Sequence, residues 1–376
     1  MADLSTVFTG LKFENPFLLS SAPPTESDAN IMRAFEAGWA GVVTKTIGLH
    51  PVVNVKGPKT KFLRAENSAY NMSMNKRQNS TLVASWNWEL ISDKPIDWWI
   101  GRLSKVKKAY PKKMLVASIM AGSGNDKELN NWQTLTKACQ DEGVDALELN
   151  FSCPHMDRVD MGSNVGKNKV LCSVVTQAVK EVAKIPVWVK LTPATADIAE
   201  EAAASFRGGA DAISSSNTFP SLPLIDPNTL DFEMSVDGLV SSGGLGGPAI
   251  LPLSLHKMSQ MTRAFADKEF SGIGGIATFD HALCYFLLGC GTVQVCTAAM
   301  LDQAIGPNVI KALIAGMNEF MERRSFSHLE DFRGLRRDRV VSHSQIKRPE
   351  QFDYRGGYES EEQEGYARPQ PVLAKS

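Results

Sequence analysis

The sequence predicts an α/β protein in which eight parallel strands alternate with helices and close into a (β/α)8 barrel. One observation is a recurring junction, in which a helix ends at glycine and a short apolar strand ends in polar residues. It appears as AGWAGVVTKT (37–46), EGVDALELN (142–150), GGADAISSSN (208–217) and GCGTVQVCT (289–297). Repeated units of this kind with buried strands imply a parallel sheet. A doubly wound open sheet is the alternative, but no G-x-G-x-x-G motif follows the first strand.

The second observation is that further apolar runs fit between these junctions and complete the alternation. They predict strands at Phe17–Ser21, Met114–Met120, Ile185–Lys190 and Phe270–Gly274, which with the four junction strands, among them Ala146–Leu149, make eight. Helical periodicity predicts helices at Asp28–Ala37, Ala196–Phe206, Phe279–Leu288 and Gly306–Glu322. Two more helices are expected to bury the stripes Trp132, Leu135, Cys139 and Val170, Val174, Ala178, Val182.

Composition excludes several classes of function. The 376 residues are 43% hydrophobic and 22% charged with net charge −1, which gives no reason to expect nucleic acid or an anionic membrane as a partner. No apolar run reaches the roughly 18–20 residues that span a bilayer, and the N-terminus lacks signal-peptide regions, so a cytoplasmic location is expected. The six cysteines form no C-x-x-C pair, so no metal site is predicted.

Three segments do not fit a minimal barrel. Residues 47–92 and 218–250 are long insertions, which after barrel strands usually form active-site walls or lids. Beyond Arg324 the chain is polar and lacks helical periodicity. We therefore expect a barrel domain over 1–324 and a C-terminal extension over 325–376, which is either a solvated tail or an arm that wraps a partner subunit.

Polar groups stand at the expected strand ends, which in a barrel face one rim and form the active site. The stretch LELNFSCPH (147–155) leaves the core with Asn150 and then Cys153. Other strands end at Ser20–Ser21, Lys45–Thr46, Lys190, Asn217–Thr218, Gly274–Gly275 and Cys296–Thr297. A lysine that ends an apolar strand, as Lys190 does, is costly unless it meets an anion or forms a Schiff base.

Three glycine-rich turns indicate phosphate binding. GIGGI (272–276) and VCTAAM (295–300) lie where barrels bind phosphate, and GGLGG (243–247) adds a third. Bare N–H groups before a helix favour an anion. The amides Asn87, Asn150 and Asn217 with Thr218 suit a neutral ring of alternating C=O and N–H groups. Cys153 is then a proton donor or a nucleophile, and the residues alone do not choose between these roles.

At this point the motifs resemble a known family. The matching stretches are LKFENPF, RAFEAGWAGVVTKT, NWELIS, VASIM, DALELNFSCPH, VKLTP, GGADAISSSNT, GGLGGPAI, GGI, VQVCTA and HLEDFRG, from Leu11 to Gly334. They resemble the flavin-containing, pyrimidine-reducing part of dihydropyrimidine dehydrogenase, within the dihydroorotate dehydrogenase superfamily. The resemblance implies a TIM barrel that binds FMN and acts on a CH–CH bond.

The resemblance also assigns roles. Cys153 matches the general acid, and Asn87, Asn150, Asn217 and Thr218 match the ring-holding residues. Cofactor contacts are implied for Ser21, Ala22, Lys45, Thr46, Lys190, Gly246, Gly274, Gly275, Cys296 and Thr297. His155 resembles the dihydropyrimidine branch. Two stretches depart from the family, the insertion between Val53 and Trp86 and the loop MDRVDMGSNVGKN (156–168). Both would border the substrate, so a relative of uracil is also compatible.

Three functions therefore follow as hypotheses. The first is an FMN-dependent oxidoreductase that interconverts uracil or thymine, or a similar cyclic amide, with its dihydro form. The second is a dihydroorotate dehydrogenase. The third is a non-redox barrel that uses Lys190 for a Schiff base or only binds phosphate. In the first two, electrons pass to or from a partner protein or a soluble acceptor, and a homodimer is expected from the family.

Overall fold

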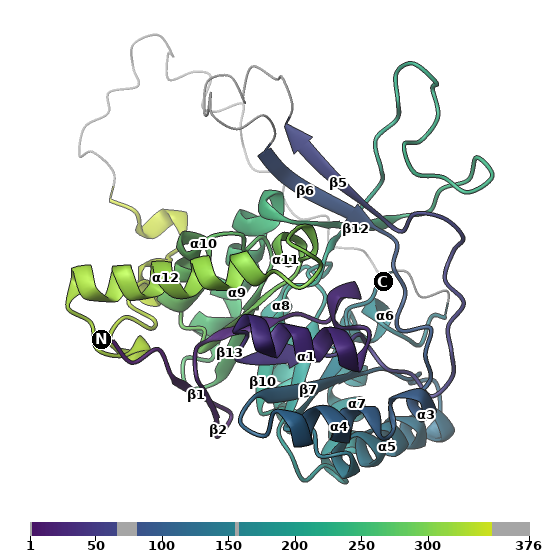
Figure 1. The fold of residues 1–376 in the computed structure, drawn as a ribbon, viewed down its shortest axis with the longest axis horizontal. Helices are drawn as coiled ribbons and strands as arrows, with labels where there is room; N and C mark the ends of the chain where they lie inside the picture. The colour runs from purple at the N-terminus through teal and green to yellow at the C-terminus, as the bar shows by residue number, and fades with distance from the viewer. Residues whose placement is uncertain (1, 66–80, 155–157, 348–376) are drawn as a thin grey trace, which may run out of the picture. The chain divides into compact units, whose positions relative to one another are not determined.

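The computed structural model describes residues 2–65, 81–154 and 158–347. The chain divides into a unit over Met1–Asp338 and a second over Arg339–Ser376. In the first unit, eight parallel strands close into a barrel in the order β3-β4-β7-β8-β9-β10-β13-β14. Figure 1 labels β7, β10 and β13 of this barrel. The ring closes where β14 pairs with β3, with Val293 opposite Phe17. The predicted (β/α)8 fold is confirmed. The strands are β3 (Phe17–Leu19), β4 (Gly41–Val43), β7 (Met114–Ile119), β8 (Ala146–Phe151), β9 (Val187–Leu191), β10 (Ala212–Ser215), β13 (Glu269–Ile273) and β14 (Thr292–Val295).

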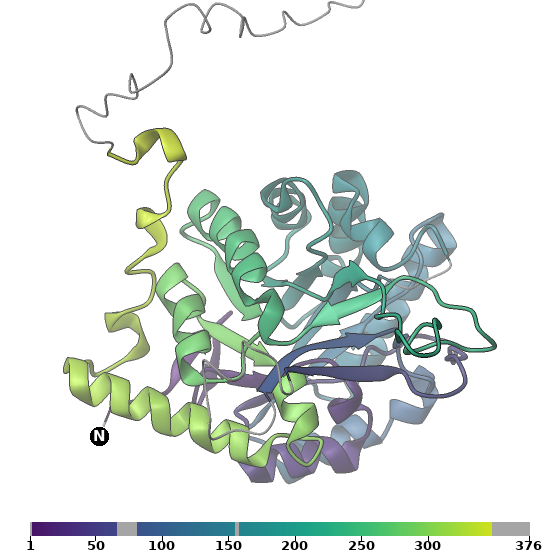
Figure 2. The ribbon, with the colours of Figure 1, turned by 90° about the horizontal axis from the view of Figure 1, so that it is seen from above.

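Helices surround the strands, as Figure 2 shows from above. Several begin where the sequence provides a cap: the side chains of Ser27, Asn125, Asp197 and Thr278 each accept a backbone N–H in the first turn. The helices are α1 (Asp28–Ala37), α3 (Ile96–Trp99), α4 (Arg102–Ala109), α5 (Asp126–Asp141), α6 (Ser163–Gly166), α7 (Lys169–Lys180), α8 (Ile198–Arg207), α9 (Leu251–Ala264), α10 (Phe279–Leu288), α11 (Thr297–Leu301) and α12 (Pro307–Arg324). Among the described residues, no helix is both long and apolar enough to cross a membrane.

The stripe expected on α7 is wrong in three of its four members, since Val182 lies beyond the end of the helix and is only half-buried. Val170 is 69% exposed and Val174 is 39% exposed. The helix instead buries Cys172, Val175, Thr176, Ala178 and Val179. These residues keep the helical spacing but lie on a different face of the helix from Val170 and Val174. Thr176 can be buried on this face because its hydroxyl donates to the carbonyl of Cys172.

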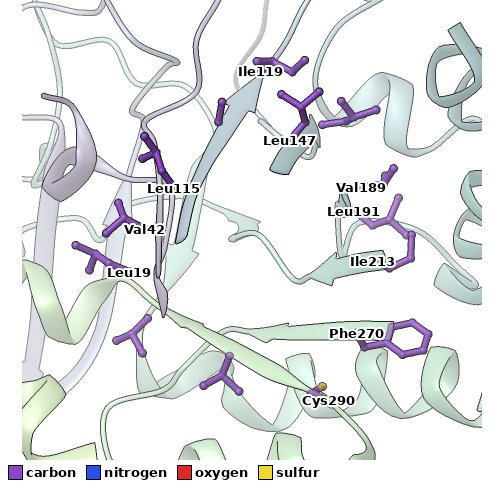
Figure 3. Close-up of a cluster of buried hydrophobic side chains, with 14 of the residues drawn as sticks. Leu19, Val42, Leu115, Ile119, Leu147, Val189, Leu191, Ile213, Phe270 and Cys290 are labelled. Carbon is purple, nitrogen blue, oxygen red and sulfur yellow. The ribbon is translucent and has the colours of Figure 1, made fainter. Parts of the chain in front are cut away.

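The strands use alternate residues for two different cores. Outward-facing side chains such as Leu19, Leu147 and Phe270 belong to one buried cluster (Figure 3). The helix residues Phe35 and Trp132 belong to the same cluster. Since successive side chains point to opposite faces of a strand, the intervening residues fill the barrel. At the start of the strands this interior is apolar and is plugged by a hairpin, β1 (Thr6–Phe8) and β2 (Leu11–Phe13).

The plug and the next interior layer differ in polarity. Phe8 lies edge-on to Trp188 with ring centroids 5.0 Å apart, and the indole of Trp188 donates to the Thr9 hydroxyl at 3.0 Å. One step along the strands, the buried residues become polar: Glu148, Lys190, Ser214 and Gln294. The interior thus changes from an apolar plug to a polar floor toward the carboxyl ends of the strands.

The two insertions meet in one antiparallel sheet. Its strands are β5 (Thr60–Ala65), β6 (Thr81–Asn87), β11 (Phe219–Ser221) and β12 (Gly243–Gly246), in the order β11-β12-β6-β5. Trp86 and Trp88 from the first insertion pack with Met234 from the second. The expectation of a glycine-rich turn at 243–247 is therefore corrected: 243–246 form a strand. A Cβ on Gly243 would lie 2.2 Å from the Trp86 ring, so glycine allows the two strands to approach.

The compact unit that contains the barrel continues beyond the boundary expected at residue 324. Leu329 and Phe332 are buried in the main core. Arg333 donates to Glu269 at 2.6 Å and to the carbonyl of Gly289 at 2.9 Å, next to strands β13 and β14. These contacts attach residues 326–333 to the barrel. In the second unit the structure describes residues 339–347, which include a single 3-10 turn at His343–Gln345.

Candidate active site

A cavity opens at the carboxyl ends of the barrel strands and is walled by the insertion sheet. It contains about 1060 Å³ of empty space, a volume that includes its open mouth. All the predicted site residues line it, which brings seven strand ends and both insertions together. They are Ser21, Ala22, Lys45, Thr46, Asn87, Asn150, Cys153, Lys190, Asn217, Thr218, Gly246, Gly274, Gly275, Cys296 and Thr297. Their individual roles stay predictions.

Two lysines bring positive charge to the cavity, and each has a carboxylate beside it. Lys45 Nζ lies 2.8 Å from Glu89 Oε2, where the first insertion returns to the barrel. Lys190 Nζ lies 3.7 Å from Glu148 Oε1 on the neighbouring strand, and both of these side chains are at most 5% exposed. Each of these two lysines is therefore balanced by a carboxylate among the described residues, although only Glu89 also lines the cavity.

The amide side chains are held by one hydrogen bond each on their nitrogen. Asn150 Nδ2 donates to Thr46 Oγ1 at 2.9 Å, Asn217 Nδ2 donates to Ser152 Oγ at 2.9 Å, and Asn87 Nδ2 donates to the carbonyl of Gly244 at 3.3 Å. An amide nitrogen carries two hydrogens, so each retains a donor for a ligand. The three are thus oriented by the protein without being saturated by it.

Cys153 lies just past the end of β8 and is 6% exposed while lining the cavity. Its carbonyl accepts the N–H of Ser163 at 2.9 Å. Ser152 is fully buried and donates to Asn150 Oδ1 at 2.8 Å, so it orients the amides and does not line the cavity. His155 falls outside the described residues.

The loop that follows Cys153 is attached to the loop after β7. Asp160 accepts the backbone N–H groups of Ser123 and Gly124, each at 3.2 Å. Arg158 bonds both carboxylate oxygens of Asp160 and, at 2.6 Å, Glu128. The hydrogen bonds from Arg158 hold the pKa of Asp160 below its usual range. This stretch, which departs from the family pattern, is thus anchored by charged contacts.

The opposite end of the cavity fits a phosphate. Gly274 and Gly275 have φ of +121° and +77°, and a Cβ on them would lie 2.2 Å from Ser254 Oγ and 2.6 Å from Leu251 Cβ. Their backbone is therefore bare and closely backed by protein. Ser216 Oγ would lie 3.3 Å from a Cβ on Gly274, and beside Gly246 the hydroxyl groups of Ser85 and Thr297 share a hydrogen bond of 3.0 Å. Bare backbone and hydroxyl groups of this kind suit an anion.

The residues present also fit the rest of a flavin mononucleotide. Lys190 lies at the barrel floor, where a cation can face the electron-rich edge of a ring, and Lys45 and Thr46 line the cavity near it. Burial raises the pKa of the Cys296 thiol to about 11, so this group stays neutral near pH 7. Among the described residues, no cluster of three His, Cys, Asp or Glu side chains is arranged for a metal.

Sequence reasoning missed several polar residues of the site. Glu89 and Gln294 line the cavity, and Glu148 lies beneath it. A signal for Glu148 existed: it stands two positions before Asn150 in the apolar strand ALELNF, so both share the inward face. Gln294 could have been found in the same way in TVQV. Glu89 could not, because its partner lies on a different segment of the chain.

The fold and this cavity define a (β/α)8 barrel whose cavity residues fit a flavin mononucleotide. The family model for dihydroorotate dehydrogenase matches residues 3–321. The chain is 36% identical to the chloroplastic dihydropyrimidine dehydrogenase (NADP(+)) of Arabidopsis thaliana, over 92% of this chain and 79% of the relative. It is 34% identical to the NAD-dependent dihydropyrimidine dehydrogenase subunit PreA of Escherichia coli K12, over 92% and 80%.

A third relative is the catalytic subunit of dihydroorotate dehydrogenase B (NAD(+)) of Thermoplasma acidophilum, 29% identical over 89% of this chain and 99% of the relative. The chain belongs to the dihydroorotate dehydrogenase family, as the resemblance predicted. It is an FMN-dependent flavin oxidoreductase that acts on CH–CH donors.

Proposed function

We propose that the chain interconverts a neutral pyrimidine-like cyclic amide, such as uracil or thymine, with its dihydro form. The observation that carries this choice is the charge balance of the cavity. Lys45 and Lys190 are each paired with a carboxylate at 2.8 and 3.7 Å. Orotate and dihydroorotate carry a carboxylate, which loses its bound water on entering the cavity and would then need a cation that is not already paired. A uracil ring is uncharged and needs only hydrogen bonds. A balanced cavity therefore favours the neutral ring.

The amides supply those hydrogen bonds. Asn87, Asn150 and Asn217 each keep one N–H in reserve. The side-chain oxygens of Asn87 and Asn217 each accept one backbone N–H and keep a second lone pair, whereas Asn150 Oδ1 accepts two hydrogen bonds from Ser152 and acts toward a ligand as a donor. A pyrimidinedione presents alternating C=O and N–H groups that match such a set. Thr218, whose N–H donates to Asn217 Oδ1 at 2.8 Å, helps to fix that amide. We assign these four residues to binding and orienting the ring.

FMN, when bound, supplies the hydride chemistry of the reaction. We assign the proton to Cys153 Sγ, which would protonate C5 of the ring during reduction and take the proton back during oxidation. Its burial supports this role because a site closed to water needs a positioned acid. Lys190 would balance negative charge that develops at the floor of the cavity.

We further propose that electrons reach this chain through a partner protein. PreA and the Thermoplasma relative are both named as subunits of NAD-dependent enzymes. The expected result is that NADH or NADPH alone reduces the flavin of the isolated chain slowly. Rapid bleaching of the flavin by either nucleotide without added protein would contradict it.

The substrate proposal is tested with FMN-loaded protein that has been photoreduced without oxygen. Uracil, thymine and orotate are mixed with it in turn, and flavin reoxidation is followed by stopped-flow absorbance. Faster reoxidation by uracil or thymine than by orotate is expected. Faster reoxidation by orotate would identify a dihydroorotate dehydrogenase instead. Protein that binds no flavin but forms a borohydride-reducible adduct at Lys190 would support the Schiff-base alternative.

A further inference from the structure

Glu148 is a fully buried carboxylate with no role in the reaction proposed above. It lies in the middle of β8 and faces the barrel interior beneath the cavity. One of its oxygens, Oε2, accepts hydrogen bonds from Ser214 Oγ and Gln294 Nε2, both at 2.8 Å. Gln294 is fixed in turn, because its Oε1 accepts the Ser20 hydroxyl at 3.2 Å. Strands β8, β10 and β14 and the end of β3 thus hold this carboxylate in one orientation.

The other oxygen is left for Lys190. Glu148 Oε1 has no hydrogen-bond partner among the described residues, and Lys190 Nζ lies 3.7 Å from it. An ionised carboxylate without solvent persists only beside a positive charge, and the same holds for an ammonium. Lys190 lines the cavity while Glu148 does not. The pair therefore connects a charge at the ligand surface with a counter-charge fixed inside the barrel.

We propose that Glu148 is a positioning residue. It keeps Lys190 charged and facing the cavity while the flavin ring of bound FMN is uncharged. This inference rests on the proposed role of Lys190 beside FMN. Without Glu148, an ammonium facing a neutral ring would have no counter-charge and would release its proton. Reduction of the ring would bring negative charge, and the proton would return. With Glu148 in place, Lys190 therefore keeps its proton whether the cofactor is oxidised or reduced.

The other groups around Lys190 do not supply this charge. Asn150 and Ser214, which lie opposite Lys190 on the neighbouring strands, are uncharged. Lys45 is balanced by Glu89 at 2.8 Å. The Cys296 thiol, with its pKa raised to about 11 by burial, stays neutral between about pH 7 and 9. A proton that appears in this range after removal of Glu148, and only while Lys190 is retained, is therefore assigned to Lys190.

The test uses the FMN-loaded full chain and the variant Glu148→Gln, which keeps the side-chain shape. The midpoint potential of the flavin is measured between about pH 7 and 9. We expect a steeper fall with pH than in the wild type, by about one further proton per two electrons. The matched controls are Lys190→Met and the double variant Glu148→Gln/Lys190→Met, in which the added slope should be absent.

An unchanged slope in Glu148→Gln would overturn the proposal, and so would an added slope that persists in the double variant. If Glu148→Gln alone does not fold, the proposal requires the double variant to fold and bind FMN, since no unpaired charge remains. A double variant as unstable as the single one would count against it. Failure of the substrate proposal would appear in the reoxidation by uracil, which this titration does not use.

Discussion

The two lysine–carboxylate pairs of the cavity differ in how firmly the protein fixes them. Lys45 and Glu89 form a wall pair, 2.8 Å apart and with side chains 8% and 19% exposed. Lys190 and Glu148 form a floor pair, 3.7 Å apart, with side chains 5% and 0% exposed. The shorter pair is the more exposed one. The longer pair contains a carboxylate held by two further hydrogen bonds inside the barrel.

Because of this difference, we expect the two pairs to have different roles. At the wall, both charged groups line the cavity, so a ligand can compete for either of them. At the floor, only the lysine lines the cavity and its counter-charge is enclosed by strands. Since electrostatic effects grow as water is excluded, the floor should govern the cofactor and the wall should govern which substrate enters.

The largest effect is expected from a change at Cys153, which belongs to neither lysine–carboxylate pair. Cys153→Ala should lower turnover on the order of 10²–10⁴-fold, because a positioned general acid is lost. FMN content and photoreduction should be unchanged, since the floor pair and the phosphate end are untouched. Stopped-flow reoxidation of the photoreduced variant by uracil measures this. Reoxidation at the wild-type rate would leave Cys153 as a loop residue and make His155 the next candidate, since Ser152 does not line the cavity.

At the floor, Lys190→Ala should lower the flavin midpoint potential and slow reduction by roughly 10²-fold, because a preorganised charge facing the reduced ring is lost. Spectroelectrochemical titration and photoreduction rates measure the two effects. The matched control is Lys45→Ala, which removes the wall charge. Equal shifts in potential for both variants would remove the distinction between floor and wall.

At the wall, Glu89→Gln should change selectivity more than cofactor properties. It leaves the Lys45 charge uncompensated in the cavity, so binding of orotate relative to uracil should rise by about tenfold, equivalent to about 1.4 kcal/mol. Perturbation of the flavin spectrum on titration with each ligand gives the two dissociation constants. An unchanged ratio would show that the wall pair does not set substrate charge.

The smallest effect is expected outside both pairs, at the loop after Cys153. Arg158→Ala should lower the free energy of unfolding by at most about 1 kcal/mol, because the Arg158 side chain is 50% exposed and its ion pairs are screened. The lowered pKa of Asp160 in the folded state gives a stabilisation present above its unfolded value of about 3.9. It is lost as pH falls through the folded pKa.

Thermal melts of the wild type and Arg158→Ala at several pH values would therefore differ near pH 7 and converge at strongly acidic pH. A difference that grows under acid conditions would contradict this assignment. Lys169→Ala, which removes a surface ion pair to Glu200 away from the cavity, is the matched control.

Much of the fold followed from local patterns. Strands such as GVV (41–43) and TVQV (292–295) are short and β-branched, so each can be predicted from its own residues. The rim also followed, because parallel strands bring their carboxyl ends together whatever lies between them. Predictions failed where a local pattern was ambiguous. The valines of α7 offered an apolar stripe at helical spacing, yet Cys172, Val175 and Val179 provided a competing one that the barrel buries.

The sequence by itself determined the barrel, the rim residues and the family, since periodicity, strand ends and motifs are properties of contiguous residues. Only the tertiary structure decided which charges balance each other. Glu89 meets Lys45 across 44 residues, and Glu148 meets Lys190 across a strand pairing, with Gln294 reaching Glu148 from 146 residues away. Such partners are fixed by closure of the barrel and by the pairing of β6 with β12, and neither is encoded within one segment. Electrostatic pairing depends on distance in space, so the charge balance from which we propose the substrate appears only after folding.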